Sequence, residues 1–463
     1  MEKVIKFLEL LKKSIYVESE HRYSGFIKIA QKILWPEVWK ILKKQFETVI
    51  PDHFDDLNKF SEIHDKLLSY ENQLSDLEMM PSNINDISNF LKNIKYHYFK
   101  KNKNEFLQMV RDVLQSNDQN TVEVKDELER GGFNIFGDKK IKFNNIKENK
   151  EKSEMDDNSF KLPTCHITIQ TQTIVEIAYQ KMNEAVESDE LNAIEAIYNV
   201  RDLFVLFRAI STLYHQDSIE FIPNRAMLFY NDCIYIAHHL LTLGHHYQSK
   251  LRPPLDSTVT FIDMVPTYRQ LGQMYFKKQL RRQRDIILND LKQINGFENL
   301  SDDNKLENTE RIFRNILYQL DYLSKNWKII LANEVYLQAI GLLFNSLLEE
   351  ILNEVLNIKS ISNNELHQLK YLLSLLMIQS KEWFTFTMGS GKEKIVEQAP
   401  ILKYVELWEK FQQLFKIFEI SINQVLEGGW TKYNKFSKQE LLTIFRSRFQ
   451  HLPEMNHLEE LLE

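Results

Sequence analysis

Residues Pro223–Tyr247 have the sequence PNRAMLFYNDCIYIAHHLLTLGHHY, and this stretch decides the fold. It opens on a proline, which suits the first turn of an α-helix because the amide hydrogen that proline lacks has no helical partner there. No other proline follows before Arg252-Pro253-Pro254, which ends the segment. The stretch therefore predicts one long helix.

The segments on both sides repeat this pattern of long helices with short breaks. Apolar residues return every three or four positions, which is the period of a helix with one buried stripe. The pattern predicts helices near residues 192–214, after Pro266, after Ser301-Asp302-Asp303, and over 335–356. The predicted stripes are Leu203, Phe207, Ile210 and Leu213 in the first helix, Leu271, Met274, Ile287, Leu291 and Ile294 in the second, and Ile312, Ile316, Leu320 and Leu323 in the third.

Two capping boxes locate helix starts closer to the C-terminus. Ser362 with Glu365, and Ser437 with Glu440, have the spacing at which the two side chains cap each other's backbone amides. Between them, apolar side chains in steps of three and four predict one interior helix ended by Gly428-Gly429. The apolar residues of that predicted helix are Trp408, Phe411, Phe415, Phe418, Ile422 and Val425.

Before residue 162 the chain divides into two parts. Residues 1–115 have helical periodicity, and Trp35 and Trp39 lie one turn apart around Pro36, where we expect one element to end and another to begin. Residues 116–161 are rich in Asn, Lys, Glu and Asp, which predicts a disordered linker. The expected organisation is thus a helical domain over 1–115, a polar linker over 116–161 and a helical-bundle domain over 162–463.

Composition supports an all-α fold. The chain has 463 residues, of which 43% are hydrophobic, so it can bury a large core, and at this length more than one domain is expected. It contains only 12 Gly and 10 Pro, too few for the frequent turns of a sheet protein. The formal net charge of -7 argues against nonspecific nucleic-acid binding by the whole chain.

Cysteine usage and hydropathy indicate a cytosolic protein. The two cysteines, Cys165 and Cys233, cannot form a disulfide framework. The N-terminus lacks the pattern of a signal peptide and instead resembles an amphipathic helix. The most apolar short run, Tyr371–Ile378, is far below the ~20 residues that span a bilayer, so any membrane association is expected to be peripheral.

The sequence contains no enzyme signature. The closest approach to a metal site is a group of histidines near Cys233, but positions seven residues apart on a helix are separated by about 10.5 Å along the axis, too far to share one zinc ion. Gly389-Ser390-Gly391-Lys392 lacks the first glycine of a phosphate-binding loop, and Glu393 stands where that motif has Ser or Thr. We therefore predict no catalytic, cofactor-binding or metal-binding residue; the histidines are His238, His239, His245 and His246.

One cluster of charge stands out as a binding candidate. On a helix, Lys277, Arg281 and Arg284 share a face, while Lys278 and Arg282 flank it. Such a patch could contact an acidic partner helix or anionic lipid, or it could be a solvated face balanced by neighbouring Glu and Asp.

Two stretches resemble the Zeste-white 10 centromere/kinetochore family: Ser159–Cys165, with the sequence SFKLPTC, and Asn231–His245, with the sequence NDCIYIAHHLLTLGH. Further collinear similarities follow at Thr260–Pro266, Leu317–Leu320 and Ala339–Leu343. The resemblance is specific over about residues 159–450 and is fainter before them, where Ile33-Leu34-Trp35 is the best anchor.

This resemblance implies a cytoplasmic, non-catalytic scaffold built of elongated, stacked helix bundles of the multisubunit tethering-complex type. One implied role is in the Rod and Zwilch complex, which brings dynein and spindle-checkpoint proteins to kinetochores in mitosis. The other is in a Dsl-type tether that acts with SNAREs at the ER membrane in Golgi-to-ER transport. Direct nucleic-acid binding is not implied, and no cofactor is.

Family members typically begin with an extensive N-terminal coiled-coil region, which we expect to be absent from this chain. Two alternatives remain open at the sequence level. The first is a peripheral membrane-binding helical protein that acts through the basic helix 277–284, and the second is a metal protein built on the histidine cluster.

Overall fold

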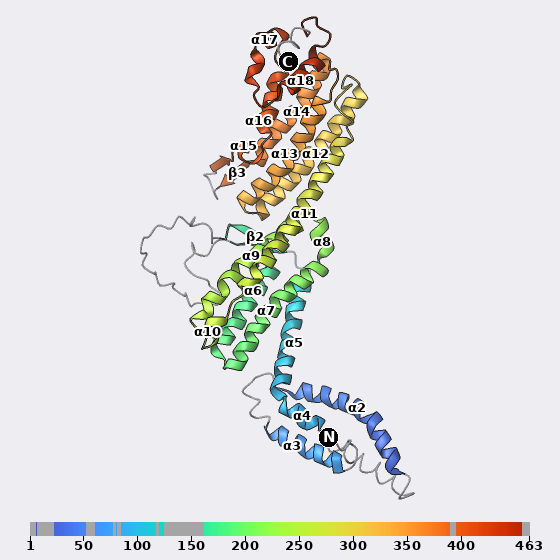
Figure 1. Cartoon of the computed structure of the whole chain (residues 1–463), viewed down its shortest axis with the longest axis vertical. Helices are drawn as coiled ribbons and strands as arrows, with labels where there is room; N and C mark the ends of the chain where they lie inside the picture. The colour runs from blue at the N-terminus through green and yellow to red at the C-terminus, as the bar shows by residue number, and fades with distance from the viewer. Residues whose placement is uncertain are drawn as a thin grey trace, which may run out of the picture. The chain divides into compact units, whose positions relative to one another are not determined.

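The computed structural model of the chain describes residue 6 and residues 23–51, 61–76, 80, 85–116, 120–124, 162–388 and 395–455. Helices dominate these residues, and only two short two-stranded sheets accompany them, so the predicted all-α class is confirmed (Figure 1). Contacts divide the chain into two compact units. Unit 1 comprises Met1–Ser116 and Gln180–Ala209, and unit 2 comprises Asn117–Tyr179 and Ile210–Glu463.

Unit 1 contains four helices among its described residues before 117: α2 (Tyr23–Val49), α3 (Ser61–Asp76), α4 (Asp86–Lys92) and α5 (Ile94–Gln115). Their core is aromatic. The Trp35 indole is buried, stacks 6.4 Å from the Trp39 ring and donates a hydrogen bond of 2.8 Å from Nε1 to Asp86 Oδ2. The buried carboxylate of Glu71 accepts hydrogen bonds of 3.1 Å from the backbone N–H groups of Ile87 and Ser88, which open α4. A polar network thus fixes α2, α3 and α4 together.

Pro36 lies inside α2 and does not begin a helix there, so the expectation of two elements meeting at this proline was wrong. Proline removes one intrahelical hydrogen bond and bends the axis, but the helix can continue when packing on both sides holds it. Here Trp35 and Phe46 anchor the same helix in one aromatic core, and Figure 1 shows α2 bending along its length.

The range predicted as a linker contains a strand. Residues 121–124 form β1 (Thr121–Val124), which pairs antiparallel with β2 (Cys165–Thr168) in the register Val122 to Ile167. Residues 125–161 lie outside the described residues, so for them the linker stays a prediction, as do the domain limits beside it.

Unit 2 continues into a pair of long helices packed at very close range, α9 (Pro223–Gln248) and α11 (Val265–Lys292). A Cβ on Gly272 of α11 would lie 2.9 Å from Cβ of Cys233 on α9, so only glycine fits at this crossing. The predicted helix starts at Pro223 and near Pro266 are confirmed. The other elements of unit 2 in this part of the chain are α8 (Gln216–Phe221), α10 (Leu255–Thr258) and η3 (Ile262–Met264), whereas α6 (Ile169–Glu187) and α7 (Glu190–Leu213) are divided between the two units.

Two adjacent buried polar residues of α9 attach β2 to the helices. Asp232 accepts hydrogen bonds from the backbone N–H of Thr168 at 2.8 Å and from its hydroxyl at 3.0 Å. Asn231 donates from Nδ2 to the carbonyl oxygens of His166 and Ile330, both at 2.8 Å. Burial raises the pKa of the Asp232 carboxyl to about 7, although the hydrogen bonds from Thr168 partly counter that rise.

The rest of unit 2 is a helical bundle around α13 (Asn333–Leu356), which packs against α12 (Asp303–Ile330), α16 (Trp408–Ile417) and α18 (Lys438–Phe449) (Figure 1). Among the described residues, α13 is the one helix long and apolar enough to cross a bilayer, and 61% of its apolar window is buried inside the protein. A central core helix meets the same criteria. The remaining elements are α14 (Asn363–Trp383), β3 (Thr385–Met388), β4 (Ile395–Gln398), α15 (Ile401–Tyr404), α17 (Ile422–Leu426) and η4 (Gly429–Lys432).

Both predicted capping boxes are confirmed, because Ser362 with Glu365 and Ser437 with Glu440 each make the two reciprocal hydrogen bonds. The single helix predicted over Trp408–Val425 was wrong. A third capping box, Ser421 with Gln424, starts α17 after α16 has ended at Ile417. Gly428, with φ +82°, follows the end of α17 as expected.

The predicted apolar stripes are buried with two clear exceptions. Leu213, which ends α7, has 78% of its side chain exposed, and Met274 of α11 has 52% exposed. The helical spacing of apolar residues does not predict burial reliably at the end of a helix, because fewer neighbouring elements cover a side chain there. Met274 belongs to the exposed face of α11 described below.

At the C-terminal ends of several helices, a lysine or arginine side chain from another helix donates hydrogen bonds to the carbonyl oxygens. The carbonyl groups of a last turn have no partner within the helix, and a cation there also interacts favourably with the helix dipole. Burial lowers the pKa of the Arg448 guanidinium to about 10, which shows how far this side chain is withdrawn from water. The donors and the residues whose carbonyl oxygens accept are Lys101 with Ile50, Lys305 with Ile294 and Asn295, Lys328 with Glu382 and Thr385, and Arg448 with Ile417.

Replacing Trp408 tests the core of the bundle. Its indole is 5% exposed and contacts the rings of Phe344 and Phe411, so Trp408→Ala should cost about 3 to 5 kcal/mol of unfolding free energy. Leu402→Ala, at a side chain 58% exposed, is the matched control and should change stability by less than about 0.5 kcal/mol. Equal melting temperatures for the two variants in calorimetry would show that Trp408 does not pack in the core.

The Asp232 carboxyl should make stability depend on pH. Because its pKa is about 7 in the folded protein and 3.8 ordinarily, the folded state holds a proton between these values that the unfolded state lacks. The free energy of unfolding should therefore fall as pH rises from about 4 to 7, by at most about 4 kcal/mol from this group. Asp232→Asn keeps one acceptor and one donor for Thr168 but cannot ionise, so its urea unfolding midpoint should fall less over that range. Parallel midpoint curves for the two proteins would contradict this account.

Candidate interaction surface on helix α11

Helix α11 separates a buried face from a charged one. Its buried residues recur at helical spacing and include Tyr268, Tyr275, Leu280 and Ile287. On the opposite side Lys277, Lys278, Arg281 and Arg282 are all exposed. We call these four residues the α11 basic face.

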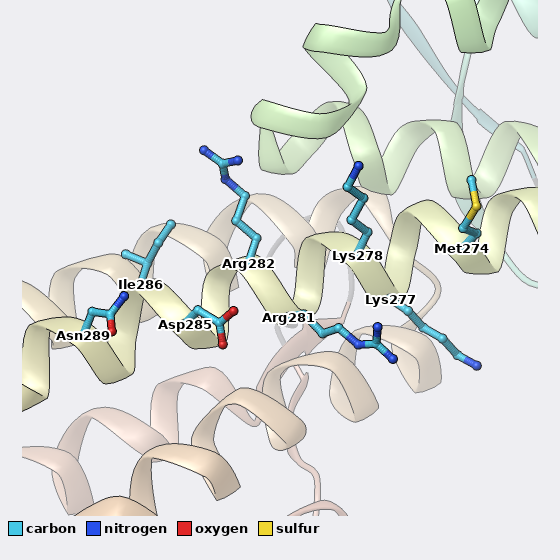
Figure 2. A pocket seen from close by; sticks show the side chains of 8 residues that line it. All are labelled: Met274, Lys277, Lys278, Arg281, Arg282, Asp285, Ile286 and Asn289. Carbon is cyan, nitrogen blue, oxygen red and sulfur yellow. The ribbon is translucent and has the colours of Figure 1, made fainter.

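The α11 basic face borders an open surface hollow of about 640 Å³ (Figure 2). Every residue that lines it belongs to α11, so it is a depression beside one helix and not an enclosed cavity. The other lining residues are Met274, Asp285, Ile286 and Asn289. Such a shape suits contact with another macromolecule better than enclosure of a small ligand.

Lys278 and Arg282 point toward α8 (Figure 2). Lys278 Nζ lies 2.7 Å from Glu220 Oε1, and the hydrogen bond from Lys278 lowers the pKa of that carboxyl. The Arg282 guanidinium lies 4.5 Å from the centre of the Phe221 ring, within the range of a cation–π interaction. Both cations therefore have intramolecular partners.

Lys277 and Arg281 point to the other side of the helix in the same view (Figure 2). Within the described parts of the chain, neither side chain has an ion pair or a cation–π contact. The fifth predicted residue, Arg284, does not line the hollow and instead lies 3.3 Å from Asp285, its neighbour in the sequence. The structure thus brings together four of the five predicted residues and leaves Arg284 at the edge.

Sequence reasoning missed Glu220 and Phe221, the residues of α8 that hold Lys278 and Arg282. They lie more than 50 positions earlier in the chain, and a short helix of mixed polarity gives no periodic signal. Only the folding of α8 onto α9 and α11 brings them near the basic residues.

Of the four histidines of α9, His239 is packed inside the protein. His239 is buried, its Nδ1 lies 3.1 Å from the Tyr179 hydroxyl, and burial lowers its pKa to about 3, so its ring is neutral. His246 Nε2 lies 3.2 Å from Lys250 Nζ, and His245 is exposed. Within the described ranges, no three His, Cys, Asp or Glu side chains are close enough to hold one metal ion. The histidine-cluster metal hypothesis therefore has no structural support there.

The cysteines are equally unsuited to chemistry. Both are buried and free, and burial raises the pKa of the Cys165 thiol to about 12 and that of Cys233 well above its ordinary value. A thiol that stays protonated is a poor nucleophile and a poor metal ligand. The segment at residues 389–392, which only partly matches a phosphate-binding loop, lies outside the described residues.

These features define a protein of stacked α-helices whose described surface offers a charged helix face. Sequence models of three successive zw10 domains match the chain in order: the middle domain at residues 1–114, the C-terminal domain of the centromere/kinetochore protein zw10 at 160–289, and the ZW10 C-terminal helical domain at 311–457. The chain belongs to the Zeste-white 10 family. The resemblance seen in the sequence is thereby confirmed.

Individual relatives agree. The chain is 28% identical to the centromere/kinetochore protein zw10 homolog of Rattus norvegicus over 418 residues, which cover 87% of this chain and 54% of that protein. It is 18% identical to the homolog of Arabidopsis thaliana, over 94% of this chain and 59% of that protein. It is 20% identical to zw10 of Drosophila melanogaster, over 66% of this chain and 40% of that protein. The chain thus spans about half the length of the curated relatives it matches.

The contact between α8 and α11 can be tested by charge reversal. Lys278→Glu places a carboxylate opposite Glu220, so the backbone amides of Gln216–Phe221 should exchange faster in hydrogen–deuterium exchange mass spectrometry. The melting temperature should hardly change, because exposed ion pairs contribute little to global stability. Lys277→Glu makes the same charge change on the same helix and should leave exchange in α8 as in the wild type. Unchanged exchange in Lys278→Glu would show that this ion pair does not hold α8.

Proposed function

We propose that this protein is a non-catalytic scaffold subunit that takes part in two different complexes. In mitosis it serves the kinetochore together with Rod-like and Zwilch-like subunits, and so takes part in dynein recruitment and the spindle checkpoint. In interphase it acts in a tether for Golgi-to-ER vesicles, together with other helical subunits and ER SNAREs. The proposed location is cytoplasmic, peripheral at the ER membrane in interphase and at kinetochores and the spindle in mitosis.

The observation that carries this proposal is the succession of three zw10 domains between residues 1 and 457. The relatives that match over most of this chain are named as centromere/kinetochore proteins. Because the chain covers about half of their length, the role of the whole relatives is transferred here as a proposal.

The chemistry of the described residues supports a scaffold. Buried histidine and cysteine side chains are held neutral, and the buried Asp232 is used to attach a strand. Four exposed basic residues are gathered on one face of α11, and the other face of this helix is packed inside the protein. Rigid helical elements with exposed charged faces are suited to binding other helical proteins.

Peripheral membrane binding through the basic helix 277–284 is the alternative function. Binding to an anionic surface depends on the number of cations that reach it together. Lys278 and Arg282 are occupied by α8, and acidic Asp285 lies within the same hollow. These contacts favour a protein partner over a lipid surface.

The test is affinity purification of the tagged chain from interphase and from mitotic cells, with proteins identified by mass spectrometry. Tether subunits and ER SNAREs are expected from interphase cells, and Rod-like and Zwilch-like subunits from mitotic cells. An untagged lysate controls for background. Recovery of neither set would refute the scaffold function, and recovery of one set alone would restrict the protein to that complex.

A further inference from the structure

The four cations of the α11 basic face repel one another, and the described residues of the protein provide partners for only two of them. Lys277 with Arg281, and Lys278 with Arg282, are like-charged pairs four residues apart, an arrangement that destabilises a helix. Glu220 and Phe221 of α8 compensate Lys278 and Arg282. Within the described ranges, no acidic side chain forms an ion pair with Lys277 or Arg281.

Two exposed apolar side chains of α11, Met274 and Ile286, point to the same side of the helix as Lys278 and Arg282 (Figure 2). Met274 lies one turn before Lys277 and Lys278, and Ile286 lies about one turn after Arg282; 52% and 37% of these side chains are exposed. Lys277 and Arg281 therefore offer two cations without an ion pair among the described residues, on the side of α11 away from these apolar side chains.

Resting on the scaffold function proposed above, we propose that Lys277 and Arg281 bind an acidic helix of a partner subunit. Lys277 and Arg281 are separated by one helical turn, a rise of about 6 Å. Two carboxylates four residues apart on a partner helix have the same spacing, so both ion pairs can form at once.

An anionic membrane fits this surface less well than a helix. A flat bilayer would meet Glu220 and Asp285 together with the cations, and the chain as a whole carries a formal net charge of -7. A single helix is narrow enough to contact Lys277 and Arg281 while leaving α8 and its acidic side chain outside the contact.

Zero-length cross-linking tests the proposal directly. A carbodiimide joins a lysine amine to a carboxylate without a spacer, so complexes purified on the tagged full-length chain are treated with it and analysed by mass spectrometry. We expect Lys277 to be joined to Asp or Glu within a helical segment of a scaffold partner. We also expect Lys277→Glu with Arg281→Glu to weaken recovery of that partner by about tenfold or more.

A matched variant excludes a general effect of charge. Lys40 and Lys44 are exposed cations four residues apart on α2, so Lys40→Glu with Lys44→Glu changes the net charge by the same amount. This variant should recover the partner as the wild type does. Equal melting temperatures for the wild type and both variants would show that each is folded.

Three outcomes would overturn the proposal, and they are distinguishable. If the wild type recovers its scaffold partners but the Lys277 and Arg281 variant recovers them equally, the scaffold function stands and this binding site falls. If the wild type recovers none, the scaffold function falls and this site falls with it. If partner recovery is unchanged while the variant loses binding to phosphatidylserine vesicles, these cations bind lipid and not an acidic helix.

Discussion

The closest contact between α9 and α11 is the constraint on which the rest of unit 2 depends. At Gly272 the two helices are so near that an added Cβ would lie 2.9 Å from Cys233 Cβ, so neither can rotate without losing the contact. Fixing α11 there also fixes its far half, where Ile287 and Leu291 enter the core of the helical bundle. With α11 held at this rotation about its own axis, Lys277 and Arg281 point into solvent. The glycine at position 272 on the buried face thus decides which side of α11 is available for binding.

A second constraint is the treatment of helix ends in a chain with few glycines. Glycine commonly ends a helix by satisfying its last carbonyl groups through a left-handed turn. This chain has 12 glycines in 463 residues, and at several ends a lysine or arginine from another helix donates to those carbonyl groups instead. Each such contact joins the end of one helix to the side of another. Helix termination and tertiary packing are therefore the same interaction at these places, as at Lys328 and Arg448.

This coupling explains what the sequence could and could not predict. Signals that lie within one turn, such as the capping boxes at Ser362 and Ser437, were found correctly. The single helix predicted across Trp408–Val425 was wrong because apolar spacing continues through the break, while the capping box at Ser421 was overlooked. Local chemistry disfavours proline inside a helix and so predicts a boundary at Pro36, yet the aromatic core around Trp35 keeps the helix continuous. Tertiary packing overrides a local preference there.

At the candidate site too, the sequence predicts the local features but not the contacts made between helices. The sequence identified the cations, since five basic residues within eight positions of one helix are a local feature. It could not tell that Lys278 and Arg282 are engaged, because their partners Glu220 and Phe221 come from α8. Charge counted along a helix overestimates the charge available for binding whenever a neighbouring helix supplies counter-charges. What distinguishes Lys277 and Arg281 is therefore their position on the side of α11 away from α8, a property that exists only once α8 has packed.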